Sequence, residues 1–134
     1  MDPDFDGVIC ALYESMCFDP GGHPDWARQS EILAPNARLV RVNDEGVFEF
    51  DPQSFRRNIE EMIASGALSG FWEGEIARET RQFADIAHVL STYETRLRRE
   101  DPPLDRAVKS IQLFRRDGRW WISALLWRRM PRNQ

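Results

Sequence analysis

The spacing of apolar residues divides the chain into a helical first half and a strand-rich second half. Apolar side chains at helical spacing predict a first helix over residues 5–16, preceded by an Asp-Pro pair at 2–3 that is typical of a helix start. A short second helix is predicted over residues 24–33. A third is predicted over residues 51–66, because a second Asp-Pro pair precedes another amphipathic stretch.

Alternation of apolar and polar residues predicts strands in the rest of the chain. Asp117-Gly118 joins two of them and is a strong signal for a tight hairpin. We find no repeat, low-complexity stretch or linker, so the pattern predicts one α+β domain over residues 1–134. The expected strands are two short ones, 37–42 and 47–50, and four long ones, 72–83, 86–98, 107–116 and 120–129.

The chain has 134 residues and can bury a substantial core. Its aromatic residues include five Trp, which is compatible with an apolar cavity or a buried dimer face as well as with a large core. The start is acidic and lacks an apolar run, so we expect no secretory signal, and no apolar run approaches the length of a membrane span. Cys10 and Cys17 lie two helical turns apart, about 10 Å along the axis, which is too far for a disulfide. We therefore expect buried free thiols and a cytoplasmic protein without membrane contact.

Charge is distributed unevenly along the sequence. Residues 1–95 carry 7 basic and 18 acidic groups, whereas residues 96–134 carry 11 basic and 4 acidic groups. The arginines of the second part are spread over strands and turns rather than clustered, so we expect them to pair with acidic groups and do not expect a nucleic-acid partner.

Several stretches resemble one known superfamily. They are residues 9–13, 32–37, 87–94, 110–113, 117–122 and 126–127. With them the chain resembles the nuclear transport factor 2-like superfamily, in particular its polyketide cyclase-like (SnoaL-like) bacterial branch. The resemblance implies a cone-shaped, cystatin-like fold in which N-terminal helices pack in a curved antiparallel sheet. It also implies a pocket between helices and sheet, and a homodimer through the outer sheet face. Isomerases, dehydratases, epoxide hydrolases, cyclases and non-catalytic binding domains share this fold.

The register that the resemblance implies assigns side chains to the two faces of the sheet. It turns Ala87, Val89, Ser91 and Tyr93 inward and His88 outward. The expected dimer face comprises Phe114, Trp120, Ile122, Ala124 and Leu126, and Ile111, Leu113 and Leu125 are expected inside. The expected ligand-binding residues are Tyr13, Trp26, Arg41, Val89, Ser91, Tyr93, Trp121, Ser123 and Trp127.

Tyr13 and Arg41 bear on the ketosteroid isomerase branch of the superfamily. Tyr13 matches a helix tyrosine that donates to the substrate oxyanion there, although a buried tyrosine can equally bond a backbone carbonyl. Arg41 stands where that branch has its aspartate base, and arginine cannot abstract a proton at neutral pH. Ser110 or Ile111 stands where its second aspartate would be. Isomerisation by that mechanism is therefore not expected.

Arg41 leaves two alternatives open. It can hold a ligand carboxylate inside the cone, or it can pair with Glu49 or Glu94 at the rim. Acid–base candidates are His88, Asp85 and Tyr93 beside Tyr13. With no second ligand at metal spacing near His88, we expect neither a metal nor a cofactor.

Two functions of different class follow from the sequence. The first is a homodimeric module whose aromatic-lined pocket holds a small apolar or carboxylate-bearing molecule. The alternative is a cyclase, dehydratase or isomerase with acid–base side chains in that pocket. A third possibility is a protein–protein adaptor that uses the sheet face.

Overall fold

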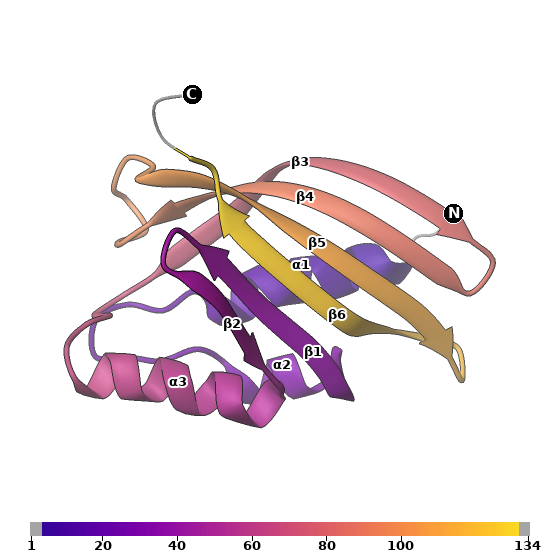
Figure 1. The fold of residues 1–134 in the computed structure, drawn as a ribbon, viewed down its shortest axis with the longest axis horizontal. Helices are drawn as coiled ribbons and strands as arrows, with labels where there is room; N and C mark the ends of the chain where they lie inside the picture. Colours follow the sequence, from indigo (N-terminus) through magenta and orange to yellow (C-terminus); the bar gives the residue numbers. More distant parts are fainter. Residues whose placement is uncertain (1–3, 132–134) are drawn as a thin grey trace.

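A computed structural model describes residues 4–131 of the chain (Figure 1). Helices form the first part and long strands the second, as the apolar spacing predicts. In chain order the elements are α1 (Asp4–Met16), α2 (Trp26–Ser30), β1 (Leu33–Asn43), β2 (Gly46–Phe50), α3 (Pro52–Ala64), β3 (Trp72–Phe83), β4 (Ile86–Arg96), β5 (Asp105–Arg116) and β6 (Arg119–Arg129).

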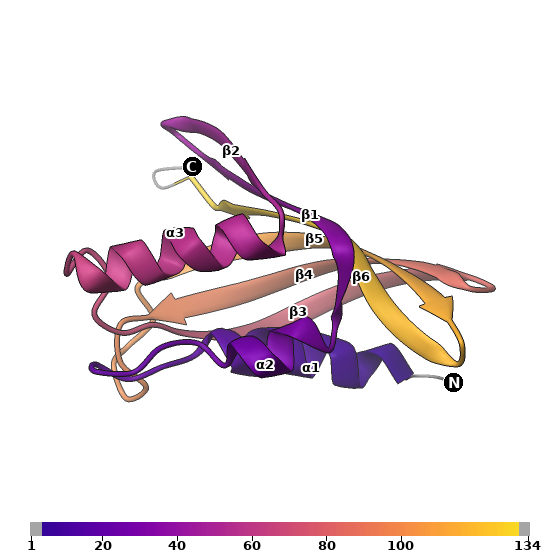
Figure 2. The ribbon, with the colours of Figure 1, turned by 90° about the horizontal axis from the view of Figure 1, so that it is seen from below.

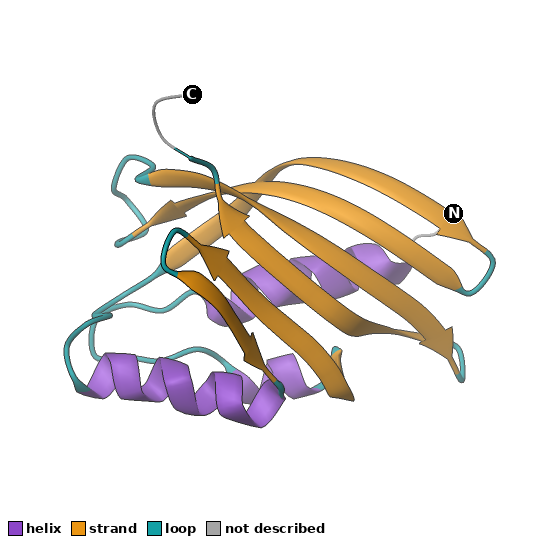
Figure 3. Cartoon of the chain, viewed as in Figure 1, coloured by secondary structure: helices purple, strands orange, loops and turns teal. Residues whose placement is uncertain are grey.

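The six strands form one curved sheet in the order β2-β1-β6-β5-β4-β3 (Figure 3). Strands β3 to β6 make an antiparallel meander, and β2 folds back against β1 as a hairpin. Strand β1, however, runs parallel to β6, because the long stretch of chain between them allows a crossover connection. The predicted α+β architecture is confirmed, and the sheet is mixed rather than wholly antiparallel.

All three helices lie on the concave side of the sheet (Figure 2). Helix α1 packs on β3 and β6, whereas α3 packs on β1 and β2. The core between them is closed by side chains with almost no exposure, among them Ile9, Leu39, Ile111 and Ile122. Helices α1 and α3 thus cover different parts of one concave face.

Helix starts and turns follow the local chemistry of the sequence. Asp51 caps α3 by accepting a hydrogen bond from the Ser54 backbone N–H, and the Ser54 hydroxyl accepts one in return from Asp51. Asp117 and Gly118 both adopt positive φ, 55° and 75°, which matches the right-handed twist of the β5–β6 hairpin. The predicted cap at residues 2–3 lies outside the described residues.

The second helix is shorter and the first strand longer than the sequence predicts. Helix α2 ends at Ser30, and β1 begins at Leu33, where the Ile122 N–H donates to the carbonyl of Ile32. Register is lost between Leu33 and Arg38. This irregularity accommodates Pro35, which has no N–H to give to a ladder. Pairing with β6 thereby overrides the local helical pattern.

Strand β6 contains a bulge at Ser123 that reverses the predicted alternation. Gln112 pairs with Ala124 but Leu113 pairs with Ile122, so Ser123 is an extra residue. Trp120 and Ile122, predicted on the outer face, are instead buried inside, with 3% and 0% exposure. Trp121 and Ser123 were expected inside, and this prediction is wrong for both because they precede or form the bulge.

The cysteines are free, as expected. Cys10 is exposed on α1, however, and Cys17 is only half-buried, so the expectation of two buried thiols is wrong. None of the described helices has the length and apolar character needed to cross a membrane.

Candidate functional site

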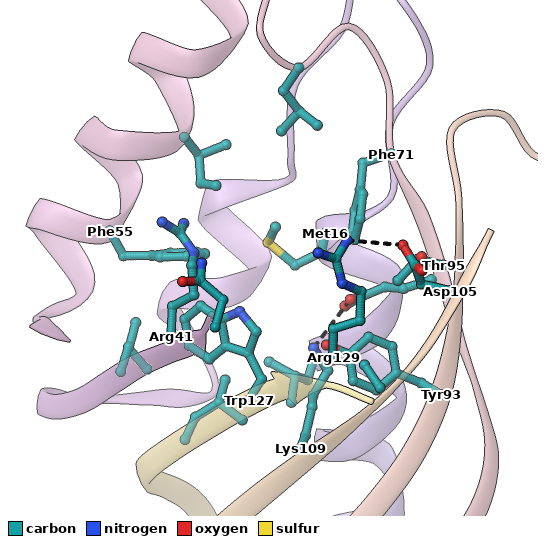
Figure 4. A pocket seen from close by; sticks show the side chains of 18 of the residues that line it. Met16, Arg41, Phe55, Phe71, Tyr93, Thr95, Asp105, Lys109, Trp127 and Arg129 are labelled. Carbon is teal, nitrogen blue, oxygen red and sulfur yellow. Dashed lines mark hydrogen bonds and ion pairs between the residues drawn. The ribbon is translucent and has the colours of Figure 1, made fainter. Parts of the chain in front are cut away.

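A cavity of about 510 Å³ lies between the helices and the concave face of the sheet (Figure 4). Apolar side chains from α1, α3 and the inner strand faces form most of its wall, and Arg41, Glu73, Tyr93, Lys109 and Arg129 are polar groups within it. Arg129 is paired with Asp105 at 3.2 Å. The polar residues Gln29, Asn43, Glu45, Thr95, Arg96 and Asp105 also line it.

Lys109 and Glu73 form a buried ion pair in the cavity wall. Lys109 Nζ lies 3.1 Å from Glu73 Oε1, and the side chains are 6% and 3% exposed. The ammonium also lies 4.2 Å from the ring centroid of Tyr93 and 5.0 Å from that of Tyr13. Two aromatic faces and one carboxylate thus hold a single cation away from water.

Glu73 is only partly satisfied by this pairing. Its Oε2 is buried and makes no hydrogen bond among the described residues. Burial raises the pKa of this carboxyl group, and the charge and hydrogen bond of Lys109 oppose that rise.

The Tyr13 hydroxyl is committed to a hydrogen-bond chain beneath the cavity. Ser91 donates its only hydroxyl hydrogen to Glu75, which also binds Arg78. Tyr13 must then donate its own hydrogen to Ser91 Oγ, 2.6 Å away. Desolvation by burial raises the Tyr13 pKa, so the phenol stays protonated. This arrangement leaves no hydrogen on Tyr13 for an oxyanion, unlike the role that the resemblance suggested.

Tyr93 offers what Tyr13 does not. It lines the cavity, its ring lies 5.5 Å from that of Tyr13, and its hydroxyl makes no hydrogen bond within residues 4–131. Burial raises its pKa, so the phenol remains a donor at neutral pH. Tyr93 is thus a protonated hydrogen-bond donor without a protein partner among the described side chains.

Arg41 projects from β1 into the cavity on the same face as Leu39. Its guanidinium donates to Asn58 Oδ1 at 2.9 Å and lies 5.2 Å and 6.0 Å from the ring centroids of Phe50 and Trp127. Burial lowers its pKa, and no described carboxylate pairs with it. Arginine nevertheless stays charged, so the cavity carries a cation that the described chain does not neutralise.

The two carboxylates expected to compete for Arg41 are engaged elsewhere. Glu49 pairs with Arg38 on the exposed side of β1. Glu94 lies 3.6 Å from Arg96 and 3.4 Å from Arg106.

The other predicted ligand-binding residues fall into three groups. Trp127 lines the cavity beside Tyr93 and Arg41. Buried behind the wall are Val89 and Ser91, both 0% exposed, and Trp26, whose indole donates to Glu60 at 2.6 Å. Trp121 and Ser123 lie away from the cavity, and Ser123 donates to a backbone carbonyl of β5.

Two acid–base candidates lie outside the cavity. Asp85 is exposed in the β3–β4 turn and pairs with Arg115 at 2.7 Å, so its predicted place in the pocket is wrong. His88 is exposed on the outer face, where its Nε2 lies 3.1 Å from Ser110 Oγ. Neither can contact a molecule in the cavity.

Sequence reasoning missed Glu73 and Lys109. The signal was present for Lys109, because strand alternation places it on the same inward face as Ile111 and Leu113. It is also the only lysine of the chain. For Glu73 the alternation of β3 gave no comparable signal, since most of this strand is exposed.

Comparison with known proteins adds information on the fold. No family model matches the sequence, and no curated protein is detectably similar to it. Among solved structures, a Nostoc punctiforme protein of unknown function with a cystatin-like fold superimposes with a TM-score of 0.72 at 15% identity, covering 96% of this chain and 90% of that one.

Two further solved structures have the same fold. An NTF-2 like protein of unknown function from Silicibacter pomeroyi gives a TM-score of 0.64 at 16% identity, covering 95% and 93% of the two chains. A candidate ketosteroid isomerase from Shewanella frigidimarina gives 0.65 at 19% identity, covering 94% and 95%. The chain therefore has the nuclear transport factor 2-like, or cystatin-like, fold. At these identities the likeness concerns the fold and not the activity.

Proposed function

We propose that this chain is a small-molecule-binding domain whose cavity takes an organic acid. The observation that carries the proposal is Arg41, a cavity-lining guanidinium with no carboxylate partner among residues 4–131. Phe50, Trp127 and Asn58 fix its position, so little further ordering is needed when a ligand binds. A guanidinium matches a carboxylate with two parallel hydrogen bonds.

The cavity suits a compact ligand with an apolar body. Its volume of about 510 Å³ falls within the range of small-molecule sites, and its wall is predominantly apolar. The Tyr93 hydroxyl adds a neutral donor on the same cavity. Together these features favour a small aromatic or aliphatic acid over its neutral amide or ester.

A binding role is favoured over the cyclase, dehydratase or isomerase alternative. Asp85 and His88 lie away from the cavity, and Tyr13 is committed to Ser91. Tyr93 lines the cavity, but burial raises its pKa, so it is a hydrogen-bond donor there and not a base. We further propose membership of the polyketide cyclase-like branch, a cytoplasmic location and a homodimer. The first is supported by the sequence stretches that resemble the branch, the second by the two free thiols, and the third by apolar side chains on the outer sheet face.

Thermal-shift measurements with matched acids and amides test the proposal. Benzoic, phenylacetic and hexanoic acids are compared with their primary amides on wild type, Arg41→Met and Arg38→Met. Ligand at a hundred times its Kd stabilises a protein by about 2.7 kcal/mol, so a binding acid raises Tm by several degrees.

The matched control is Arg38, three residues away on the same strand, which is exposed and already paired with Glu49. Acids should stabilise wild type and Arg38→Met, and the effect should disappear in Arg41→Met. Equal shifts for acid and amide, or an acid preference that survives in Arg41→Met, would show that Arg41 is structural.

A further inference from the structure

Lys109 is chemically distinct from every other basic residue of the chain. The sequence contains 18 basic residues, and Lys109 is the single lysine among them. Its ammonium is almost fully buried in the cavity wall, paired with Glu73 and flanked by Tyr13 and Tyr93. A buried ion pair needs only a cation, and arginine is the usual choice for that role.

The difference between the two cations lies in the proton. A guanidinium stays protonated in proteins, whereas an ammonium can lose a proton and become a nucleophilic amine. Glu73 lies 3.1 Å from Lys109 Nζ and is positioned to accept that proton. Its second oxygen, Oε2, is buried without a hydrogen-bond partner among the described residues, so it can carry the proton or accept a hydrogen bond from a bound molecule.

Sheet register links Lys109 to Arg41. Trp127 pairs with Arg41 on one side and with Lys109 on the other, so the three residues form one row across β1, β6 and β5. All three line the cavity. Two strand spacings separate the Cα atoms of Arg41 and Lys109 by about 10 Å. Long side chains from the two ends can therefore reach opposite ends of one small molecule lying over Trp127.

We propose that Lys109 captures the carbonyl group of an oxo acid as a Schiff base while Arg41 holds its carboxylate. This inference rests on the proposed acid-binding cavity and adds the ligand class, an aldehyde- or ketone-bearing acid. A bond forms between Lys109 Nζ and the carbonyl carbon, and the carbonyl oxygen leaves as water.

The step balances without any further reactant. An ammonium and a carbonyl group give a protonated imine and one water molecule. Glu73 takes one proton from the ammonium so that the free amine can add, and returns it to the departing hydroxyl group. Tyr93, a protonated donor in the same cavity, is available to the carbonyl oxygen during addition.

A single lysine makes the test simple, because the α-amine is the only other primary amine of the chain. The protein is incubated at pH 7.5 with 4-carboxybenzaldehyde or its methyl ester and reduced with sodium cyanoborohydride. Intact mass and peptide mapping then assign each adduct to Lys109 or to the α-amine. The α-amine, with an ordinary pKa of about 8 against about 10.4 for lysine, is the amine that normally reacts first.

Native protein should be labelled at Lys109 at least about tenfold faster than at the α-amine, and the order should reverse in urea. Lys109→Arg should lose the Lys109 adduct and keep the α-amine adduct. Labelling of the α-amine alone in native protein would overturn the inference, and this result needs no variant. An acid preference that depends on Arg41 in the thermal-shift experiment would then still support the binding function. If the ester labels Lys109 as fast as the acid does, the role of Arg41 in the inference is wrong.

Discussion

Lys109 and Glu73 form an ion pair from which solvent is almost excluded, and the stability of such a pair depends on both partners being present. Removing one partner leaves the other charge buried and uncompensated. Replacing both residues with apolar ones leaves no buried charge in the cavity wall. The pair therefore gives the interior of this protein a distinct pH dependence.

We expect Lys109→Met to lower the free energy of unfolding by about 3–5 kcal/mol at pH 8. The loss should shrink toward pH 5. Burial raises the pKa of Glu73, and in Lys109→Met the ammonium that opposes this rise is gone, so the carboxyl group becomes protonated and uncharged as pH falls. A carboxyl group with a raised folded-state pKa favours the folded state below its ordinary pKa, and this contribution is lost as pH rises through the folded value. Urea unfolding at the two pH values measures the difference.

The double variant Glu73→Leu/Lys109→Met is the control for this experiment. It should recover most of the stability, since no charge then remains buried. A double variant as unstable as Lys109→Met would mean that packing rather than charge is responsible.

The neighbouring tyrosines Tyr13 and Tyr93 should respond differently to loss of the hydroxyl group. Tyr13→Phe removes a buried hydrogen bond to Ser91 and should cost about 1 kcal/mol in urea unfolding without changing acid affinity. Tyr93→Phe removes a hydroxyl with no described protein partner, so its stability should change little while acid affinity falls. Reduced acid affinity in Tyr13→Phe would contradict the hydrogen-bond direction inferred here.

Strand β6 illustrates, at the scale of elements, what the sequence can predict about this fold. The alternation of β4 and the hairpin at Asp117-Gly118 could be predicted from the sequence, because the local pattern and the turn residues agree with the fold. The bulge at Ser123 could not be predicted, because it depends on how β6 pairs with β5 and has no local sequence signal. One inserted residue reversed the predicted faces of Trp120 and Trp121.

The same limit applies to the site. Arg41 and Tyr93 could be assigned to the concave face by strand alternation once the resemblance had set the register. The Lys109–Glu73 pair could not, because it joins β5 to β3, and these strands are not neighbours in the sheet. Contacts across the hollow of a curved sheet depend on its curvature rather than on any local pattern.

Helix α3 supplies the side of the cavity that carries Phe55 and Ile59, so its start affects the site. Asp51→Ala removes the capping box and should cost about 1 kcal/mol in thermal or urea unfolding. Asp44→Ala is a suitable comparison, since Asp44 is an exposed turn residue paired with Arg128 and should change stability by under about 0.5 kcal/mol. Equal losses in the two variants would argue against the cap.

At the scale of the whole molecule, the outer face of the sheet presents an apolar surface. Ile86, Leu90 and Leu126 are 59%, 39% and 42% exposed on it, and Phe114 and Trp121 lie half-buried beside them. These residues lie on the outer face of strands β4, β5 and β6. Trp120 and Ile122, which were predicted on this face, are buried on the other side of the sheet. Surfaces of this kind mark an interface in many proteins.

We therefore expect a homodimer through this face. Light scattering at micromolar concentration should give about twice the chain mass of 15.7 kDa for wild type. Leu126→Glu should give the single-chain mass with unchanged circular dichroism, and Glu61→Lys, at an exposed position of helix α3 on the other side of the sheet, serves as the control charge change. A wild-type monomer would contradict the dimer.

Calorimetric titration measures directly whether the cavity selects an acid through Arg41. The acid that stabilises wild type most, and its amide, are titrated into wild type, Arg41→Met and Arg38→Met. A hydrogen bond to a charged group is worth about 1.5–3 kcal/mol, so Kd for the acid should rise about ten- to a hundredfold in Arg41→Met alone. The amide should bind the three proteins equally and more weakly than the acid binds wild type. An unchanged Kd for the acid in Arg41→Met would show that Arg41 does not select the acid.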